Sequence, residues 1–332
     1  MANMNSTKLH VVYGDATLGL HGEGFDYIFS YGGGPESIVI DGKEWLYRTL
    51  KPTFWRATTD NDRGNRLHMR SGMWLSADMF LPCRGVKVCI DGNEELPKAP
   101  MNNQFVGNET AENVSITFTY ITITVPETKV EVTYDITPDG KMVVTAHYFG
   151  NEKLPELPVF GMRFIMPTKA DGFTYEGLSG ETYPDRMAGG IPGIYEVEGL
   201  PVTKYVVPQD CGVHMDTEWV KIYRSRVQSN VGRDIKVYGT KEDKPLDRFG
   251  IQISAHNEKF AFSCLPYTAE ELENATHQEA LPPARRTVLC VLGRVRGVGG
   301  FDSWGADVED AYRISAAEDI TFSFAISPIK ND

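Results

Sequence analysis

Residues 114–125 read Val-Ser-Ile-Thr-Phe-Thr-Tyr-Ile-Thr-Ile-Thr-Val, an alternation of apolar and polar side chains with one slip at Tyr120-Ile121. A period of two is typical of a β-strand that buries one face. Residues 130–136 alternate in the same way, and Pro-Asp-Gly at 138–140 predicts a turn into a third alternating run at 142–148. The stretch therefore predicts antiparallel strands, with the turn at 138–140 closing the clearest hairpin.

Similar short runs, separated by glycines, prolines and Asp-Gly pairs, continue through most of the chain. We expect further strands near residues 8–13, 25–30, 36–41, 85–90, 160–167, 203–207, 219–225, 234–239, 248–256, 259–266, 287–296 and 319–327. About 15–20 antiparallel strands predict an all-β fold of two large packed sheets. Strand density is equal on both sides of the proline-containing stretch 151–158, so we expect a single domain over residues 1–332.

Helical signals are scarce. Thr268 and Glu271 have the spacing of a capping box and predict one short helix over residues 269–276. A second short helical segment is expected near Ser71. A (β/α)₈ barrel needs eight helices, so the pattern excludes that fold.

Charge and composition exclude several classes of partner. The net charge is −12, from 33 basic and 45 acidic residues, which argues against nucleic acid because phosphate binding needs a basic surface. Arg294 and Arg296 alternate along a predicted strand after Arg285-Arg286, and we interpret them as a solvated strand face rather than a contact with an acidic partner.

The sequence also bears on the compartment. No run approaches the roughly 20 apolar residues of a membrane helix. The start of the chain lacks the basic and apolar regions of a signal peptide, so we expect a cytoplasmic protein with no membrane contact. Five widely spaced cysteines without a CxxC pair predict neither disulfides nor zinc.

Residues 54–64 read Phe-Trp-Arg-Ala-Thr-Thr-Asp-Asn-Asp-Arg-Gly. Asp60 and Asp62 have the spacing that opens a calcium loop, but the glycine falls one place early and no glutamate follows at the twelfth position. Asp and Asn side chains commonly cap turns through local backbone hydrogen bonds. We therefore predict a structured loop held by its own carboxylates, with Gly64 as a flexible joint.

Residues 177–186 read Gly-Leu-Ser-Gly-Glu-Thr-Tyr-Pro-Asp-Arg. Glu181 and Asp185 offer the two carboxyl groups that glycoside hydrolysis uses. We favour a structural turn at Asp185-Arg186, or an ion pair of Arg186, over that catalytic interpretation. The seven histidines are scattered, without the spacing of a metal pair on a helix.

Residues 299–305 read Gly-Gly-Phe-Asp-Ser-Trp-Gly. Three glycines allow a tight turn that pushes Trp304 out of a strand end. The indole is then either buried in the hydrophobic core, as large aromatic side chains commonly are, or a platform for the apolar face of a sugar ring. The residues alone favour a carbohydrate-binding or subunit role over an independent enzyme.

Three segments together suggest a family. Arg-x-x-x-Asp-Asn-Asp-x-Gly at 56–64, Tyr-Pro-Asp-Arg at 183–186 and Gly-Gly-x-Asp-Ser-Trp at 299–304 resemble, in order and spacing, elements of one domain of known enzymes. This is the C-terminal domain of the large bacterial β-galactosidases of glycoside hydrolase family 2. The resemblance extends from about residue 9 to residue 329. The chain looks like the small subunit of the two-chain β-galactosidases, to which residues 54–64 and 266–276 are very similar.

The resemblance implies an antiparallel β-supersandwich like that of the galactose mutarotases. It also implies that this chain holds no catalytic residue and no metal, because the two catalytic glutamates, Mg²⁺ and Na⁺ belong to a large-subunit partner. Trp304 is expected to bind substrate by stacking on a sugar, with Asp302 and Ser303 beside it. A mobile active-site loop is expected at Asp60, Asn61, Asp62, Arg63 and Gly64.

The expected function is to complete the active site of a retaining β-galactosidase, which hydrolyses terminal β-D-galactosides such as lactose and transfers galactosyl groups. The chain alone is then inactive. One alternative is a stand-alone aldose mutarotase or epimerase, for which His147 or His214 with Glu181 are the only acid/base combinations. The other is a non-catalytic carbohydrate-binding module, which predicts galactoside binding by the lone chain.

Overall fold

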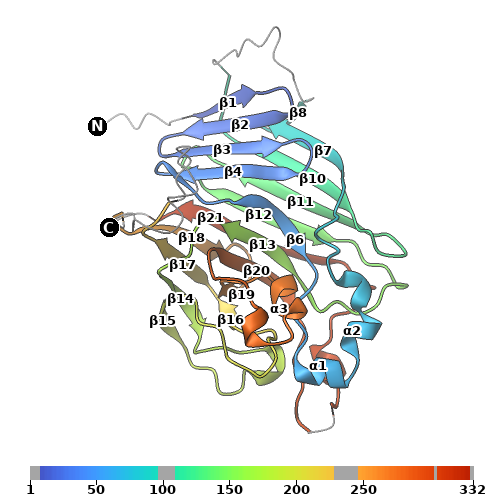
Figure 1. Ribbon diagram of the computed structural model, residues 1–332. Helices are drawn as coiled ribbons and strands as arrows, with labels where there is room; N and C mark the ends of the chain where they lie inside the picture. Colours follow the sequence, from blue (N-terminus) through green and yellow to red (C-terminus); the bar gives the residue numbers. More distant parts are fainter. Residues whose placement is uncertain (1–7, 96–108, 228–245, 303–304, 330–332) are drawn as a thin grey trace.

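The alternating stretch at 114–148 forms three consecutive strands in the computed structural model, which describes residues 8–95, 109–227, 246–302 and 305–329 (Figure 1). These strands are β10 (Val114–Ile121), β11 (Lys129–Ile136) and β12 (Met142–Tyr148). They pair antiparallel in an unbroken register, and every second side chain along each of them is buried, which gives the sheet one buried face. The predicted hairpin is confirmed, although the first strand ends at Ile121, before a turn in which Thr122 and Thr124 hydrogen-bond to each other.

The largest sheet has ten strands, in the order β15-β14-β17-β18-β21-β12-β11-β10-β7-β8. The remaining members of this sheet are β7 (Cys83–Ile90), β8 (Asn93–Glu95), β14 (Gly172–Leu178), β15 (Pro192–Glu198), β17 (Trp219–Arg224), β18 (Phe249–Ala255) and β21 (Ile320–Pro328).

Two smaller sheets pack against the ten-stranded sheet. The six-stranded sheet runs β5-β4-β3-β2-β1-β9, with β1 (Leu9–Tyr13), β2 (Thr17–Gly22), β3 (Phe25–Ser30), β4 (Gly34–Ile40), β5 (Lys43–Glu44) and β9 (Thr110–Ala111). The five-stranded sheet runs β16-β19-β20-β13-β6, with β6 (Arg48–Thr53), β13 (Val159–Met166), β16 (Val213–Thr217), β19 (Phe260–Leu265) and β20 (Thr287–Val295).

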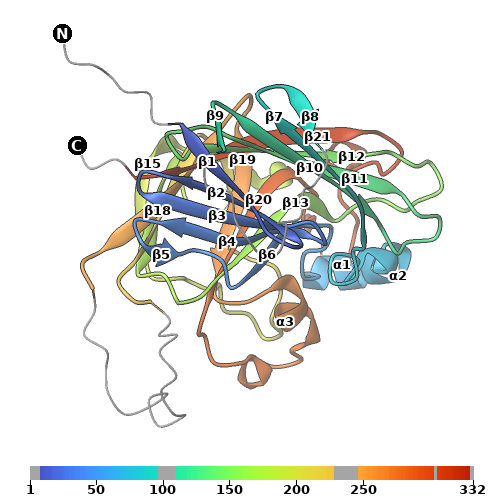
Figure 2. The same ribbon diagram turned by 90° about the horizontal axis from the view of Figure 1, so that it is seen from above.

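Aromatic contacts define the two layers. Phe29 of β3 packs on Phe118 of β10, and Phe160 of β13 meets Phe322 of β21 edge to face. Figures 1 and 2 accordingly show the two smaller sheets side by side against the large one. The all-β antiparallel class and the broad two-layer supersandwich are confirmed. The second layer, however, is divided into two sheets rather than being one.

The helices are few and short. The predicted capping box is confirmed at α3 (Ala269–Asn274), where Thr268 and Glu271 bond each other's backbone N–H groups. A 3₁₀ turn, η1 (Gly72–Trp74), lies where a second helical segment was expected. Two further helices, α1 (Asp60–Gly64) and α2 (Leu67–Arg70), were not predicted. None of the helices in the described part of the chain has the length and apolar character that crossing a bilayer requires.

Some predicted strands differ from the structure. Residues 203–207 form an irregular segment with exposed Tyr205 and Val206, and residues 234–239 lie outside the described residues. The strands that were not predicted are β2, β5, β6, β8, β9, β14, β15 and β16. The five-stranded sheet matters most for function, because β6 leads into α1 and β20 leads into the glycine-rich segment after residue 296.

Candidate functional site

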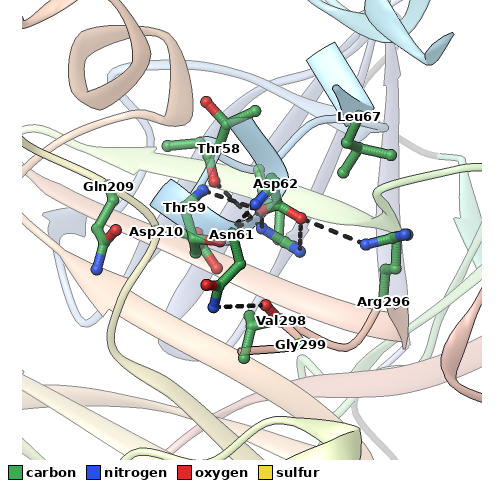
Figure 3. Close-up of polar contacts among 12 residues, drawn as sticks. Thr58, Thr59, Asn61, Asp62, Leu67, Gln209, Asp210, Arg296, Val298 and Gly299 are labelled. Atoms are coloured by element: carbon green, nitrogen blue, oxygen red, sulfur yellow. Dashed lines mark hydrogen bonds and ion pairs between the residues drawn. The ribbon is translucent and has the colours of Figure 1, made fainter. Parts of the chain in front are cut away.

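The three sequence motifs meet around one loop, which runs from Gly297 at the end of β20 to Asp307. Ser303 and Trp304 lie outside the described residues, so the structure shows the frame of this loop and both of its ends. We call residues 297–307 the tryptophan loop. Figure 3 shows the centre of its frame, where α1 lies above the backbone of Val298 and Gly299.

Helix α1 forms because Thr59 and Asp62 satisfy each other's backbone donors. The N–H of Asp62 donates to Thr59 Oγ1 at 3.2 Å, and the N–H of Thr59 donates to Asp62 Oδ2 at 2.9 Å. This capping box replaces the loop conformation that the sequence suggested. Residues Asp60, Asn61, Asp62, Arg63 and Gly64 therefore form a short helix, and their role as a mobile active-site loop stays a prediction.

Asp62 is also the centre of a buried ion cluster. Arg56 donates two hydrogen bonds to its carboxylate, from Nη1 at 2.6 Å to Oδ2 and from Nη2 at 3.3 Å to Oδ1. Arg296 Nη1 lies 3.3 Å from Oδ1 (Figure 3). Burial by itself raises the pKa of Asp62, but the charge and hydrogen bonds of Arg56 outweigh it and lower the pKa below its ordinary value. Asp62 is therefore ionised at neutral pH.

Arg296 connects this cluster to both ends of the tryptophan loop. Its side chain has no exposed surface, and its Nε donates to Glu156 Oε2 at 3.1 Å. Its Nη2 donates to the carboxylate of Asp307, at one end of the loop. At the other end, Arg56 Nη2 donates to the carbonyl of Gly297 at 3.0 Å.

The interpretation of Arg296 as part of a solvated strand face is wrong. Strand β20 ends at Val295, so the alternation of side chains stops before Arg296 and its guanidinium turns inward to three carboxylates. Arg294, still within the strand, is exposed as expected.

The Tyr-Pro-Asp-Arg motif holds the start of the loop. Asp185 accepts hydrogen bonds from the N–H groups of Val298 at 3.0 Å and Gly299 at 2.7 Å. The Arg186 guanidinium donates to the carbonyl of Gly299. Asn61 Nδ2 donates to the carbonyl of Val298 at 3.1 Å (Figure 3). The preferred structural interpretation of Asp185-Arg186 is confirmed, because the turn η3 (Pro184–Arg186) directs both side chains at the loop backbone.

The glycines of the loop are required by its conformation. Gly299, Gly300 and Gly305 have φ angles of +66°, +83° and +80°, in the left-handed region that favours glycine. The backbone conformation for which the sequence supplies glycine is therefore present at these three positions, while the tight turn over 299–305 stays a prediction. Gly305 also touches Gly64 at the end of α1, where a Cβ placed on Gly64 would lie 2.9 Å from Gly305 Cα.

Asp302 has a structural role in the described part of the loop. Its Oδ1 accepts a hydrogen bond of 2.9 Å from the N–H of Ala306, which joins the described residues on the two sides of 303 and 304. A part in substrate binding for Asp302, and for Ser303 and Trp304, stays a prediction.

Helix α3 supports the frame from the other side. Glu273 accepts hydrogen bonds from the N–H of Thr58 at 2.6 Å and from Trp55 Nε1 at 3.3 Å. It thereby fixes the strand end that leads into α1. Residues 266–276, noted above for their similarity to the small subunit, are thus tied to the motif at 56–64.

Sequence reasoning missed Asp210, which lies behind the frame. It accepts a hydrogen bond of 2.8 Å from the hydroxyl of Tyr183, and burial raises the pKa of its carboxyl to about 7 although Arg56 opposes the shift. Arg296, Glu156 and Asp307 were missed as members of the frame as well. No local pattern marks these residues, since their partners are distant in sequence.

The residues proposed for a mutarotase do not form an acid/base pair. His214 stacks on Phe262, and its Nδ1 contacts the carbonyl of Gly180, while Glu181 accepts a hydrogen bond of 2.6 Å from Thr203. Burial lowers the pKa of His214 to about 4, so the ring is a neutral packing group. His147 contacts Asp319 instead. Among the described residues, no group of three or more His, Cys, Asp or Glu side chains is placed to hold a metal ion.

The antiparallel fold and a glycine loop framed by these three motifs define the class, a domain of the β-galactosidases. Residues 21–326 match the family described as Beta galactosidase small chain. The chain belongs to this family, as the sequence resemblance implied, and is therefore a glycosidase subunit.

Relatives fall into two lengths. The chain is 59% identical to the β-galactosidase small subunit of Latilactobacillus sakei, over 98% of this chain and 100% of that one. It is 34% identical to a β-galactosidase of Halalkalibacterium halodurans and 29% identical to one of Streptococcus thermophilus, and it spans only 28% of the length of each.

A putative aldose 1-epimerase from Escherichia coli K12 aligns over 97% of this chain and 100% of its own, with 8% identity and a TM-score of 0.40. At this level the likeness says nothing about activity.

Proposed function

We propose that the chain completes the active site of a catalytic large subunit in a two-chain β-galactosidase that acts on terminal β-D-galactosides such as lactose. The observation that carries this proposal is the frame around the tryptophan loop, in which the motifs at 56–64 and 183–186 contact the loop backbone that flanks Ser303 and Trp304. The comparisons support it, because a relative called a small subunit has the same extent as this chain, whereas the longer β-galactosidases contain it as 28% of their length.

In this proposal the large subunit supplies the two carboxyl groups of a retaining mechanism, together with Mg²⁺ and Na⁺. The present chain supplies one wall of the pocket. Trp304 offers an apolar ring face to the C–H face of a sugar, and such stacking contributes about 1–2 kcal/mol, by analogy with aromatic pairs. The same wall orients an acceptor sugar when the galactosyl group is transferred rather than hydrolysed.

The frame holds the described residues on either side of this wall before substrate arrives. Asp185 and Arg186 hold the loop backbone at one end, and Arg296 holds Asp307 at the other. Fixing the backbone that flanks a binding residue reduces the conformational entropy lost on binding, so more of the stacking energy appears as affinity. Helix α1 contacts the loop at Gly305, so a movement of α1 would displace the loop.

We infer a cytoplasmic location from the chemistry of the cysteines. All five are free thiols, and Cys211 and Cys264 are buried, as is usual for proteins kept in a reducing compartment. The net charge of −12 supports protein and sugar rather than nucleic acid as partners.

Co-expression with a candidate large subunit tests the proposal. β-Galactosidase activity that needs both chains is the expected result, with the lone chain inactive. Activity from the large chain alone would overturn the proposal. Tight galactoside binding by the lone chain would favour a carbohydrate-binding module, and mutarotation by the lone chain would favour the mutarotase alternative.

A further inference from the structure

Large apolar side chains are exposed along the segment that follows α1. We call this set the methionine face, which consists of Met69, Met73, Leu75, Met79 and Phe80. In Phe80, for example, 65% of the residue's surface is exposed. Exposed apolar side chains that gather in one segment mark an interaction site more often than isolated ones do.

The backbone beneath this face is firmly attached to the protein. Trp74 and Ala77 are buried between the exposed residues and Leu67 is buried just before them, and Trp74 Nε1 donates to the carbonyl of Pro155 at 3.0 Å. Asp78 is buried as well and lies 2.7 Å from Arg163 Nη1. The methionine face is therefore a fixed surface with adaptable side chains, which suits a protein partner because methionine fits irregular contacts well.

The segment that carries the face is locally basic in sequence, although Arg63 is paired with Asp60, and Arg70 with Glu156 and Asp307. Residues 63–77 contain three arginines and one histidine and no acidic residue, in a chain of net charge −12. Arg66 and His68 are exposed beside Met69. Methionine, aromatic and arginine side chains are enriched in protein interfaces. A partner surface that fits this face is apolar at its centre and carries carboxylates at its rim.

The methionine face is continuous with the tryptophan loop. Arg70, next to Met69, donates to the carboxylates of Asp307 at 2.7 Å and Glu156 at 3.2 Å, both members of the loop frame. Figure 1 shows α1 and α2 adjacent, with the loop passing beneath α1. A partner that closes a pocket over this loop has the methionine face directly beside it.

A neighbouring turn extends the same side of the molecule. The N–H of Ile121 donates to the carbonyl of Pro82 at 3.2 Å, so the turn after β10 lies next to the end of the methionine face (Figure 1). Ile123 and Val125 in this turn are exposed. The apolar surface thus spans two segments of the chain.

We propose that the methionine face is the docking surface for the large subunit. This inference rests on the proposed function, since it names the surface through which that partner is held. Its apolar centre, its basic rim and its continuity with the loop frame all point to the chain that supplies the rest of the pocket.

The test measures the dissociation constant of the complex between the purified chain and its large subunit. Phe80→Lys and Met79→Lys are expected to weaken binding at least about tenfold, the effect of losing an anchor residue at the centre of an interface. At saturating concentrations of the small chain, kcat should return to the wild-type value, because neither residue belongs to the loop frame. Thermal melts of the free variants check that the fold is retained.

Ile194→Lys is the matched control. Ile194 lies in β15, at the edge of the ten-stranded sheet away from β7. Its side chain is 64% exposed, nearly as much as that of Phe80. Its variant should bind within about twofold of wild type, as a residue outside an interface does. Binding as tight as wild type by both lysine variants of the methionine face would overturn the inference, as would a loss of binding confined to Ile194→Lys.

Hydroxyl-radical footprinting gives a second readout without substitution. Oxidation of Met69, Met73 and Met79 should fall when the complex forms, and unchanged oxidation would contradict docking at this face. The failure of the proposed function looks different: wild-type chain and large subunit would then form no active complex at all.

Discussion

Gly64 and Gly305 meet backbone to backbone, where the end of α1 touches the tryptophan loop. A Cβ on Gly64 would lie 2.9 Å from Gly305 Cα, and a Cβ on Gly305 would lie 2.8 Å from Gly64 Cα. Contacts this short do not occur for real side chains, so neither residue can be replaced without movement. This pair physically links the first and third sequence motifs.

Gly64→Ala tests whether this contact positions the loop. The new methyl group must displace either α1 or Gly305, and a shift of about 1 Å near a catalytic site can cost as much as 100-fold in rate. We expect kcat/KM of the assembled complex on lactose to fall about tenfold or more, with the chain still folded. Gly33→Ala is the control, because a Cβ there meets open space. Equal kinetics for Gly64→Ala and Gly33→Ala would show that the contact is irrelevant to activity.

Asp185→Ala should loosen the start of the loop. The carboxylate accepts two backbone hydrogen bonds, and hydrogen bonds to charged groups contribute about 1.5–3 kcal/mol each. We expect KM for lactose to rise more than kcat falls, because the wall of the pocket becomes mobile while the large subunit's carboxyl groups stay in place. Asp185→Asn, which keeps one acceptor oxygen, should recover part of the affinity.

Glu181→Gln provides the comparison for Asp185, because Glu181 belongs to the same motif region but bonds Thr203 instead of the loop. It should leave both kinetic constants near wild type. A large fall in kcat for Glu181→Gln would instead revive a catalytic role for this carboxylate.

Trp304→Ala tests the stacking wall itself. Loss of about 1–2 kcal/mol of stacking should raise KM for lactose roughly tenfold and impair transfer to acceptor sugars. Assembly with the large subunit should persist, and Trp304→Phe should recover part of the affinity because it keeps a flat ring. Wild-type kinetics in a fully assembled Trp304→Ala complex would rule out that Trp304 stacks on the sugar as a wall of the pocket.

The sequence predicted the parts of this structure that depend on neighbouring residues. The strands at 114–148 follow from alternation alone, and α3 follows from Thr268 and Glu271 three positions apart. Helix α1 was not predicted because its capping box uses Asp62 in place of the usual glutamate and because the helix has only five residues. Residues 203–207 have β-forming composition, yet they are not part of any described sheet.

The frame of the site could not be derived from local pattern. Arg296 is buried only because Asp62, 234 residues earlier, and Glu156, 140 residues earlier, supply its carboxylates. Nothing in the residues adjacent to Arg296 reveals this. The three motifs were connected through family resemblance. The structure gives the physical reason for their association, since the third motif is part of the tryptophan loop and the other two contact that loop.

Arg296→Met should destabilise the whole chain. The substitution leaves three carboxylates around the cluster without their shared cation, and breaking a buried ion pair costs about 3–5 kcal/mol. We expect a loss of that order in the free energy of unfolding, measured by denaturant titration. Arg294→Met, two residues away and exposed, should change it by less than about 0.5 kcal/mol. Similar values for the two variants would mean that the cluster adds nothing to stability.

Asp210 should make stability depend on pH near neutrality. Its pKa in the folded chain is about 7 because burial disfavours the charged form, whereas an unfolded aspartate has a pKa of about 3.9. Between these values the folded state binds more protons than the unfolded state, so this carboxyl makes the free energy of unfolding fall as pH rises from about 4 to 7. Asp210→Asn cannot ionise but still accepts the Tyr183 hydroxyl, so its stability should fall less over that range. Urea titrations of both proteins at pH values across the window measure the difference, and parallel pH profiles would mean that Asp210 is already ionised in the folded chain at low pH.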